Sequence, residues 1–134
     1  MEKVTVDIYY TGNNYSAHTP ILPGCVSTGS TLEEMKKNIQ EAIDFHVESS
    51  LADNDPIPEV FKGEYEIVFK LSTEALLEAY SNIFTKAALS RITGINERQL
   101  WHYAAGLRKP RPAQRKRIEE GLHRLANQLL AVTL

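Results

Sequence analysis

Residues 85–110, TKAALSRITGINERQLWHYAAGLRKP, predict two short helices separated by a glycine turn and followed by a basic loop. The first helix is expected over residues 85–93. Gly94 is suited to end it, because glycine readily adopts the left-handed backbone conformation. Asn96 is a good N-cap for the second helix, which Gly106 is expected to end.

The second of these helices has two faces of different chemistry. Leu100 and Tyr103 are expected to be buried, whereas the side chains between them can face outward together. A short helix with exposed hydrogen-bonding side chains, packed against another helix, fits the major groove of DNA. The outward side chains are Glu97, Arg98, Gln99, Trp101 and His102.

Charge divides the chain into two halves of opposite sign. Residues 1–80 carry 14 acidic and 5 basic side chains, a net charge of −9, whereas residues 81–134 carry 3 acidic and 10 basic ones, a net charge of +7. A basic half can bind phosphates by releasing counterions, and an acidic half cannot. The asymmetry predicts two domains with different partners.

Composition limits the class of protein. A hydrophobic fraction of 43% is ordinary for a soluble globular protein. No apolar run approaches the roughly 20 residues of a membrane span, and no signal peptide is recognisable. The single cysteine, Cys25, excludes an internal disulfide and fits the reducing cytosol, so we expect a cytoplasmic protein. Each half is small, which favours oligomerisation.

Apolar–polar alternation predicts strands in the N-terminal half, as in Val4, Val6 and Ile8. Strands are expected at residues 4–9, 15–19, 25–28 and 65–71. A helix capped by Ser30 or Thr31 is expected to run to about residue 50, before a proline-containing loop at 53–62. Its predicted apolar side comprises Met35, Ile39, Ala42, Ile43, Phe45 and Val47.

Two motifs give this half a resemblance to the HicB antitoxin domain. They are LPGCV at residues 22–26 and TLEE at residues 31–34, where the long helix begins. The resemblance covers about residues 3–71. It implies a shortened ribonuclease H-like βββαβ domain that binds and blocks a small ribonuclease toxin, HicA.

The second half resembles the Cro/repressor-type helix-turn-helix found at the C-terminus of many HicB proteins, although others carry a ribbon-helix-helix. The resemblance covers about residues 82–130, and residues 72–81 resemble the first helix of that domain. The predicted fold is α+β, with a toxin-binding domain at 1–71 and an all-α DNA-binding and dimerisation domain at 72–134. The match rests on Leu89, Gly94, Ile95, Leu100, Gly106 and Pro110.

The resemblance also assigns DNA-binding roles. Lys86 is expected to meet a phosphate, and Asn96 opens the reading helix. Arg98 can contact guanine, Gln99 adenine and Glu97 cytosine, whereas His102 can reach a base or a phosphate. Trp101 is expected to pack either on a sugar or thymine methyl, or on its own domain or a neighbouring subunit. The residues expected on the DNA backbone are Arg108, Lys109 and Arg111.

The last segment begins with Pro112, which suits the first turn of a helix. The apolar stripe that follows exceeds what a small helical domain needs to bury. We therefore expect residues 122–134 to form a homodimer or tetramer, with packing inside the domain as the alternative. The residues assigned to dimerisation are Leu122, Leu125, Leu129 and Leu130.

Catalysis is the less economical explanation of the acidic half. Asp7 could be a carboxylate of a metal-dependent nuclease, but the other acids lie on a helix face or in a loop. None of the four histidines is spaced as a metal ligand, and Cys25 is better explained by packing. We expect no enzyme activity, no metal and no cofactor.

The predicted function is that of a type II antitoxin that neutralises a HicA-like toxin and represses its own operon by binding double-stranded operator DNA. The alternatives are a stand-alone helix-turn-helix repressor with an acidic sensing domain, and a metal-dependent nuclease. The basic half could also be a helical hairpin in a scaffold.

Overall fold

The computed structural model describes residues 1–134 and divides into two compact units, Met1–Ala75 and Leu76–Leu134. The division falls inside helix α2 (Thr73–Ala79). The predicted domain boundary after Leu71 stays a prediction. Secondary structure is mixed, so the α+β class expected from the sequence pattern is confirmed.

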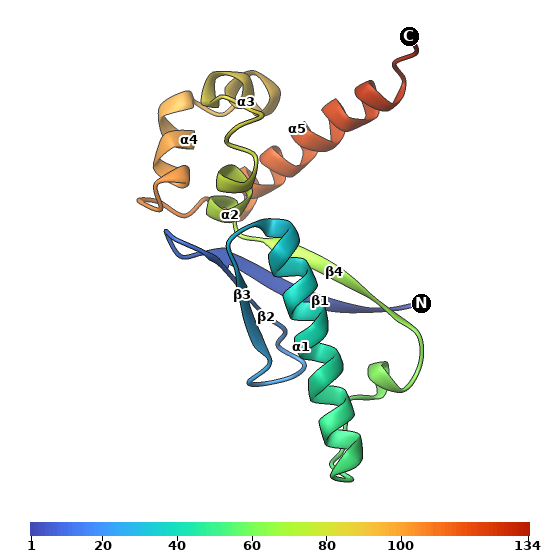
Figure 1. Cartoon of the computed structure of the whole chain (residues 1–134). Helices are drawn as coiled ribbons and strands as arrows, with labels where there is room; N and C mark the ends of the chain where they lie inside the picture. Colours follow the sequence, from blue (N-terminus) through green and yellow to red (C-terminus); the bar gives the residue numbers. More distant parts are fainter. The chain divides into compact units, whose positions relative to one another are not determined.

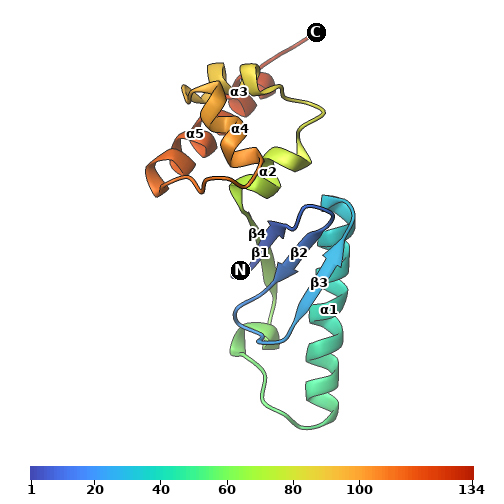
Figure 2. The same ribbon diagram turned by 90° about the vertical axis from the view of Figure 1, so that its left-hand side faces the viewer.

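The first unit contains a four-stranded sheet (Figures 1 and 2). Its strands are β1 (Glu2–Tyr10), β2 (Tyr15–His18), β3 (Val26–Gly29) and β4 (Tyr65–Leu71), in the spatial order β3-β2-β1-β4. The first three pair antiparallel, whereas β4 lies parallel to β1 with Val6 opposite Phe69. The parallel pair requires a crossover, because β4 follows the long helix in the chain.

Helix α1 (Leu32–Ala52) covers one face of this sheet (Figures 1 and 2). Thr31 caps it by accepting a hydrogen bond from the Glu34 N–H at 3.1 Å, and the Ser30 hydroxyl donates to the Glu34 carboxylate at 2.7 Å. The core between helix and sheet is apolar. Its fully buried side chains include Val4, Val6, Ile8, Met35, Ile39 and Ile43.

Two expectations for this unit are wrong. Phe45 was placed on the apolar side of the helix, but it is 72% exposed. It follows the buried Ile43 by two positions, which in a helix of 3.6 residues per turn is about 200° away. The supposed loop at 53–62 also contains a 3₁₀ helix, η1 (Glu59–Lys62), whose Val60 and Phe61 are buried.

The second unit is helical. After α2 come α3 (Lys86–Thr93), α4 (Glu97–Ala104) and α5 (Pro112–Leu130). Tyr80 follows α2 and is 39% exposed. The buried core comprises Leu77, Leu89, Ile95, Leu100, Tyr103 and Ile118.

The connection between α3 and α4 has the predicted glycine turn and the predicted asparagine cap. Thr85 caps α3 through the Ala88 N–H, and Gly94 ends it with φ of +74°. Asn96 caps α4 by accepting from the Arg98 N–H at 2.8 Å. A left-handed residue at this point satisfies the end of α3 and redirects the chain.

Two arginines of α5 hold the end of α3. Arg117 Nη2 donates to the Gly94 carbonyl at 2.8 Å, and Arg124 Nη2 donates to the Ile92 carbonyl at 3.1 Å. Carbonyls in the last turn of a helix lack partners within the helix and carry partial negative charge. These guanidinium groups therefore serve packing between α3 and α5.

None of the helices has both the length and the apolar composition that a membrane crossing requires.

Candidate functional site

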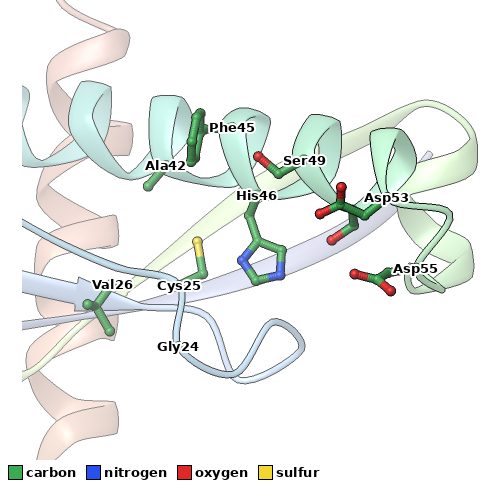
Figure 3. Close-up of a pocket in the computed structure, with 10 residues that line it drawn as sticks. Gly24, Cys25, Val26, Ala42, Phe45, His46, Ser49, Asp53 and Asp55 are labelled. Atoms are coloured by element: carbon green, nitrogen blue, oxygen red, sulfur yellow. The ribbon is translucent and has the colours of Figure 1, made fainter.

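A groove of about 500 Å³ lies between the loop before β3 and the second half of α1 (Figure 3). One wall is the loop and the start of β3, and the other is the helix and its C-terminal end. None of the lining residues is a lysine or arginine. The lining consists of Gly24, Cys25, Val26, Ala42, Phe45, His46, Ser49, Ser50, Asp53 and Asp55.

The loop wall of the groove is anchored to the core at two points. Leu22 and Cys25 are each only 4% exposed. The Cys25 N–H donates to the Leu22 carbonyl at 3.0 Å, and the Leu22 N–H donates to the Thr19 carbonyl at 3.1 Å. Gly24 adopts φ of +85°, a conformation that favours glycine. The LPGCV motif therefore encodes a tight, anchored turn that leaves Val26 exposed.

The interior of the groove is polar. Figure 3 shows the imidazole of His46, on α1, and the thiol of Cys25, on the loop, on facing sides. Burial raises the pKa of the Cys25 thiol. The thiol therefore stays protonated at neutral pH and is a weak nucleophile, in agreement with the packing role expected for it.

The end of the groove next to the C-terminus of α1 is acidic. The Asp53 and Asp55 carboxylates lie there (Figure 3) and make no ion pair within the chain. No group of three or more His, Cys, Asp or Glu side chains is arranged to hold a metal ion. Sequence reasoning missed this groove. The available signal was Phe45, which is out of phase with the buried stripe of the helix.

The outer face of α4 carries part of the expected set of site residues. Glu97, Arg98 and Trp101 are exposed, and Trp101 is 56% exposed. The structure therefore brings these three together on one face. Gln99 is half-buried, and its Nε2 donates to the Tyr103 hydroxyl at 3.0 Å, so an adenine contact requires it to exchange this bond.

Lys86 packs against Trp101 in the structure. It is only 8% exposed, and its Nζ lies 4.6 Å from the centroid of the Trp101 ring. An ammonium over an indole face is attracted by the ring quadrupole. The phosphate contact expected of Lys86 stays a prediction, and in the free chain this side chain packs on the helix that follows.

The other residues expected to contact DNA differ in their exposure. His102 is half-buried, and its Nδ1 is buried without a hydrogen-bond partner. Arg108, Lys109 and Arg111 are exposed in the loop between α4 and α5. The buried Pro110 anchors that loop, and its carbonyl accepts a hydrogen bond from Arg115 Nη1 at 3.2 Å.

An apolar groove of about 290 Å³ lies between α2 and α5 in the second unit. Beyond it, the C-terminal end of the chain exposes further large apolar residues, among them Leu130 at 84%. Of the residues assigned to dimerisation, Leu122 and Leu125 are partly buried, whereas Leu129 and Leu130 are exposed. The groove is lined by Leu76, Leu77, Tyr80, Phe84, Leu89, Ile118, Leu122, His123, Leu125, Ala126 and Leu129.

Comparison with known proteins concerns the N-terminal half. Residues 4–68 match the model of a family described as HicB_like antitoxin of bacterial toxin-antitoxin system. This segment contains every residue that lines the acidic groove. Residues after 68 lie outside the match, so it does not bear on the helical unit.

Curated relatives match over short segments. A UPF0150 protein of Synechocystis sp. is 48% identical over 44 residues, covering 33% of this chain and 56% of that protein. A UPF0150 protein of Helicobacter pylori is 46% identical over 41 residues, covering 31% and 57%. A 14.9 kDa protein from the rep-hol intergenic region of Haemophilus phage HP1 is 44% identical over 46 residues, covering 34% and 35%.

The chain spans 35% to 57% of the length of these curated relatives. The family match supports an antitoxin role. Residues 4–68 of this chain are similar to the HicB-like antitoxin family.

Proposed function

We propose that this chain is the antitoxin of a type II toxin-antitoxin system, which binds and neutralises a HicA-like, mRNA-cleaving toxin and represses its own operon by binding operator DNA. The observation that carries the proposal is the HicB-like antitoxin domain at residues 4–68. It coincides with the strongly acidic part of the chain.

The acidic charge supports a basic protein as the partner of the N-terminal unit. A ribonuclease that holds RNA needs a basic surface, and complementary potentials speed the association of two proteins. Neutralisation then requires only that the antitoxin cover the surface that holds RNA. The mechanism is occlusion, so the chain needs no enzyme activity and no cofactor.

The geometry of α3 and α4 supports a helix-turn-helix in the C-terminal unit. Gly94 joins two short helices, Leu100 and Tyr103 fix α4 to the core, and Arg98 and Trp101 face outward. In this proposal α4 enters the major groove, where Arg98 reads guanine and Glu97 accepts from cytosine.

The remaining polar residues of this unit have supporting roles in the proposal. Asn96 caps the reading helix. When DNA binds, Gln99 gives up its hydrogen bond to Tyr103, and both Gln99 and the half-buried His102 contact bases or phosphates. The Lys86 backbone N–H, rather than its ammonium, faces a phosphate at the start of α3. The loop cations Arg108, Lys109 and Arg111 contact the DNA backbone, which positions the domain without reading sequence.

The C-terminal leucines support a homodimer or a tetramer built from dimers. A patch that contains both an apolar groove and protruding leucines can pair with its own copy around a two-fold axis. Two copies then match two half-sites about one DNA turn apart. Replacement of the exposed Leu130 by Glu should reduce the mass measured by light scattering, whereas an unchanged mass would place the interface elsewhere.

Two measurements on the full-length chain test the function. Coexpressed with the protein encoded by the adjacent open reading frame, the chain should copurify with it and restore growth. It should also shift DNA from upstream of its own gene in preference to an unrelated fragment. DNA binding without copurification would favour the stand-alone repressor, and failure of both would reject the proposal.

A further inference from the structure

We propose that the acidic groove between residues 24–26 and α1 is the surface on which the toxin docks. This inference rests on the proposed function and adds the position of the contact. The occupant is a segment of a basic protein that places an apolar side chain against Phe45 and a lysine or arginine against Asp53 and Asp55.

The rim of the groove carries exposed apolar side chains. Phe45 on α1 is 72% exposed, and Val26 on the opposite wall is 65% exposed. Both belong to the lining of the groove. Exposed aromatic side chains at the mouth of a concavity are typical of binding surfaces, and a few such residues supply most of the binding energy.

The far end of the groove is suited to a cation. Asp53 and Asp55 have no ion-pair partner in the chain, and no lysine or arginine lies among the ten lining residues. A basic side chain that enters there meets two carboxylates without competition. The long stems of lysine and arginine can also lie on apolar surface while the charged head stays polar.

The spacing of these features specifies the ligand. Phe45 lies on α1 and Asp53 is its C-cap residue, eight positions later, which is about 12 Å at 1.5 Å per residue. An extended chain advances about 3.3 Å per residue, so the apolar and the basic residue of the partner should be about four positions apart. His46 and Ser49 lie between the two ends and offer polar side chains to the backbone of the partner.

Both walls of the groove are held in place before any partner binds. The helix is fixed by buried Ile39 and Ile43, and the loop by buried Leu22 and Cys25. A preformed site avoids part of the entropy cost of ordering on binding. The groove is therefore better suited to tight binding than a mobile surface.

The open face of the sheet is a poorer surface for a basic partner. It has its own exposed apolar residue, Val68, which is 39% exposed. However, the exposed Lys3 and Lys70 lie on the same strands, β1 and β4, and the Asp7 carboxylate lies 3.7 Å from His18 Nε2. Glu66 lies opposite Lys3 and Asp7 lies opposite Lys70, so the acids and lysines of this face balance, whereas the groove lining has two carboxylates and no lysine or arginine.

The test uses the full-length chain and the small basic protein encoded by the adjacent open reading frame. Phe45→Ala should raise the Kd by about 30-fold, the change typical of an interface hot spot. Leu51→Ala is the matched control. Leu51 lies on the same helix and is 57% exposed but does not line the groove, so its replacement should change the Kd by less than about threefold.

Charge reversal tests the acidic end. Asp53→Lys with Asp55→Lys should slow association by about tenfold at low salt and flatten its salt dependence, because opposite charges steer the encounter. Glu66→Lys, on the exposed face of β4, is the control and should have a smaller effect. Asp53, Asp55 and Glu66 are all exposed, so these substitutions leave the fold intact.

The outcomes separate this inference from the function on which it rests. If the wild-type chain binds the basic protein and the Phe45 and Asp53/Asp55 variants bind equally well, the docking site is wrong while the function stands. If the wild-type chain does not bind that protein, the proposed function fails and takes the inference with it. If Phe45→Ala instead dissociates a homo-oligomer, the groove holds a second copy and the proposal is overturned.

Discussion

Phe45 and Trp101 are both exposed aromatic residues on the outer faces of helices, but their surroundings differ. Phe45 stands at the rim of a groove that ends in Asp53 and Asp55. Trp101 carries the ammonium of Lys86 on its ring. In the proposed function, each unit exposes an aromatic side chain for contact, with a basic protein at Phe45 and a nucleic acid at Trp101.

The largest effects are expected when one unit is destabilised at a time, which tests whether each binding surface belongs to its own unit. Ile39→Ala in the first unit and Leu100→Ala in the second should each lower the stability of its own unit by about 2–5 kcal/mol, because both side chains are fully buried. Ile39→Ala should reduce toxin binding and Leu100→Ala should reduce DNA binding. Urea unfolding measures both effects, and the fluorescence of Trp101, the single tryptophan, reports on the second unit alone.

If either of these substitutions abolished both activities, the two units could not be treated as separate binding surfaces. Leu51→Ala serves as a control for the first unit, because Leu51 is exposed.

A smaller effect tests whether the basic surface reads sequence. Arg98→Ala should weaken binding to the preferred DNA by about 1–3 kcal/mol and leave binding to random DNA nearly unchanged. Binding titrations on both duplexes at equal salt concentration measure the difference. Equal weakening on the two duplexes would make Arg98 a phosphate contact, and the outer face of α4 would then lack one of its proposed base contacts.

The Lys86–Trp101 pair allows a finer test. Lys86→Met keeps a long apolar stem but removes the ammonium, so it should cost about 0.5–2 kcal/mol of stability in the second unit. It should also make the Trp101 fluorescence more easily quenched by iodide. A loss of one unit of salt dependence in DNA binding, with no change in fluorescence, would instead restore the phosphate role first expected for Lys86.

The smallest expected effect concerns pH and belongs to the first unit alone. The folded-state pKa of Cys25 lies above its ordinary value of 9.0, because burial disfavours the thiolate. The folded state holds this proton more tightly, so the associated stability is fully present below pH 9 and is lost as pH rises through the folded-state pKa. Cys25→Ala should remove this alkaline dependence, which urea unfolding at pH 8 and pH 10 can measure.

Local chemistry made much of the fold predictable. Thr31 and Asn96 each cap a helix within three residues along the chain, and Gly94 ends α3 through its own backbone conformation. The alternation in β1 and the i, i+4 spacing of Met35, Ile39 and Ile43 predict which faces are buried. These interactions join residues that are close together in the chain, so they can be predicted from the sequence.

The candidate sites were harder to predict. Arg98 and Trp101 were expected on the outer face of α4 and are exposed there. Their contact with DNA stays a prediction. The contact between Lys86 and Trp101 was not predicted, because the two lie fifteen positions apart and meet only when α3 packs against α4. Phe45 was misplaced because a composition argument ignored its helical angle relative to Ile43.

Taken alone, the order of residues determined the strands, the helices with their caps, the charge division and the resemblance of residues 3–71 to an antitoxin domain. Tertiary structure alone decided which distant segments share a surface. It brought the loop at 24–26 beside α1 and left Asp53 and Asp55 without ion-pair partners. It also placed Arg117 and Arg124 where they donate hydrogen bonds to carbonyls at the end of α3. The reason is physical: caps and periodicity act over one helical turn, whereas grooves and ion positions depend on packing between elements far apart in the chain.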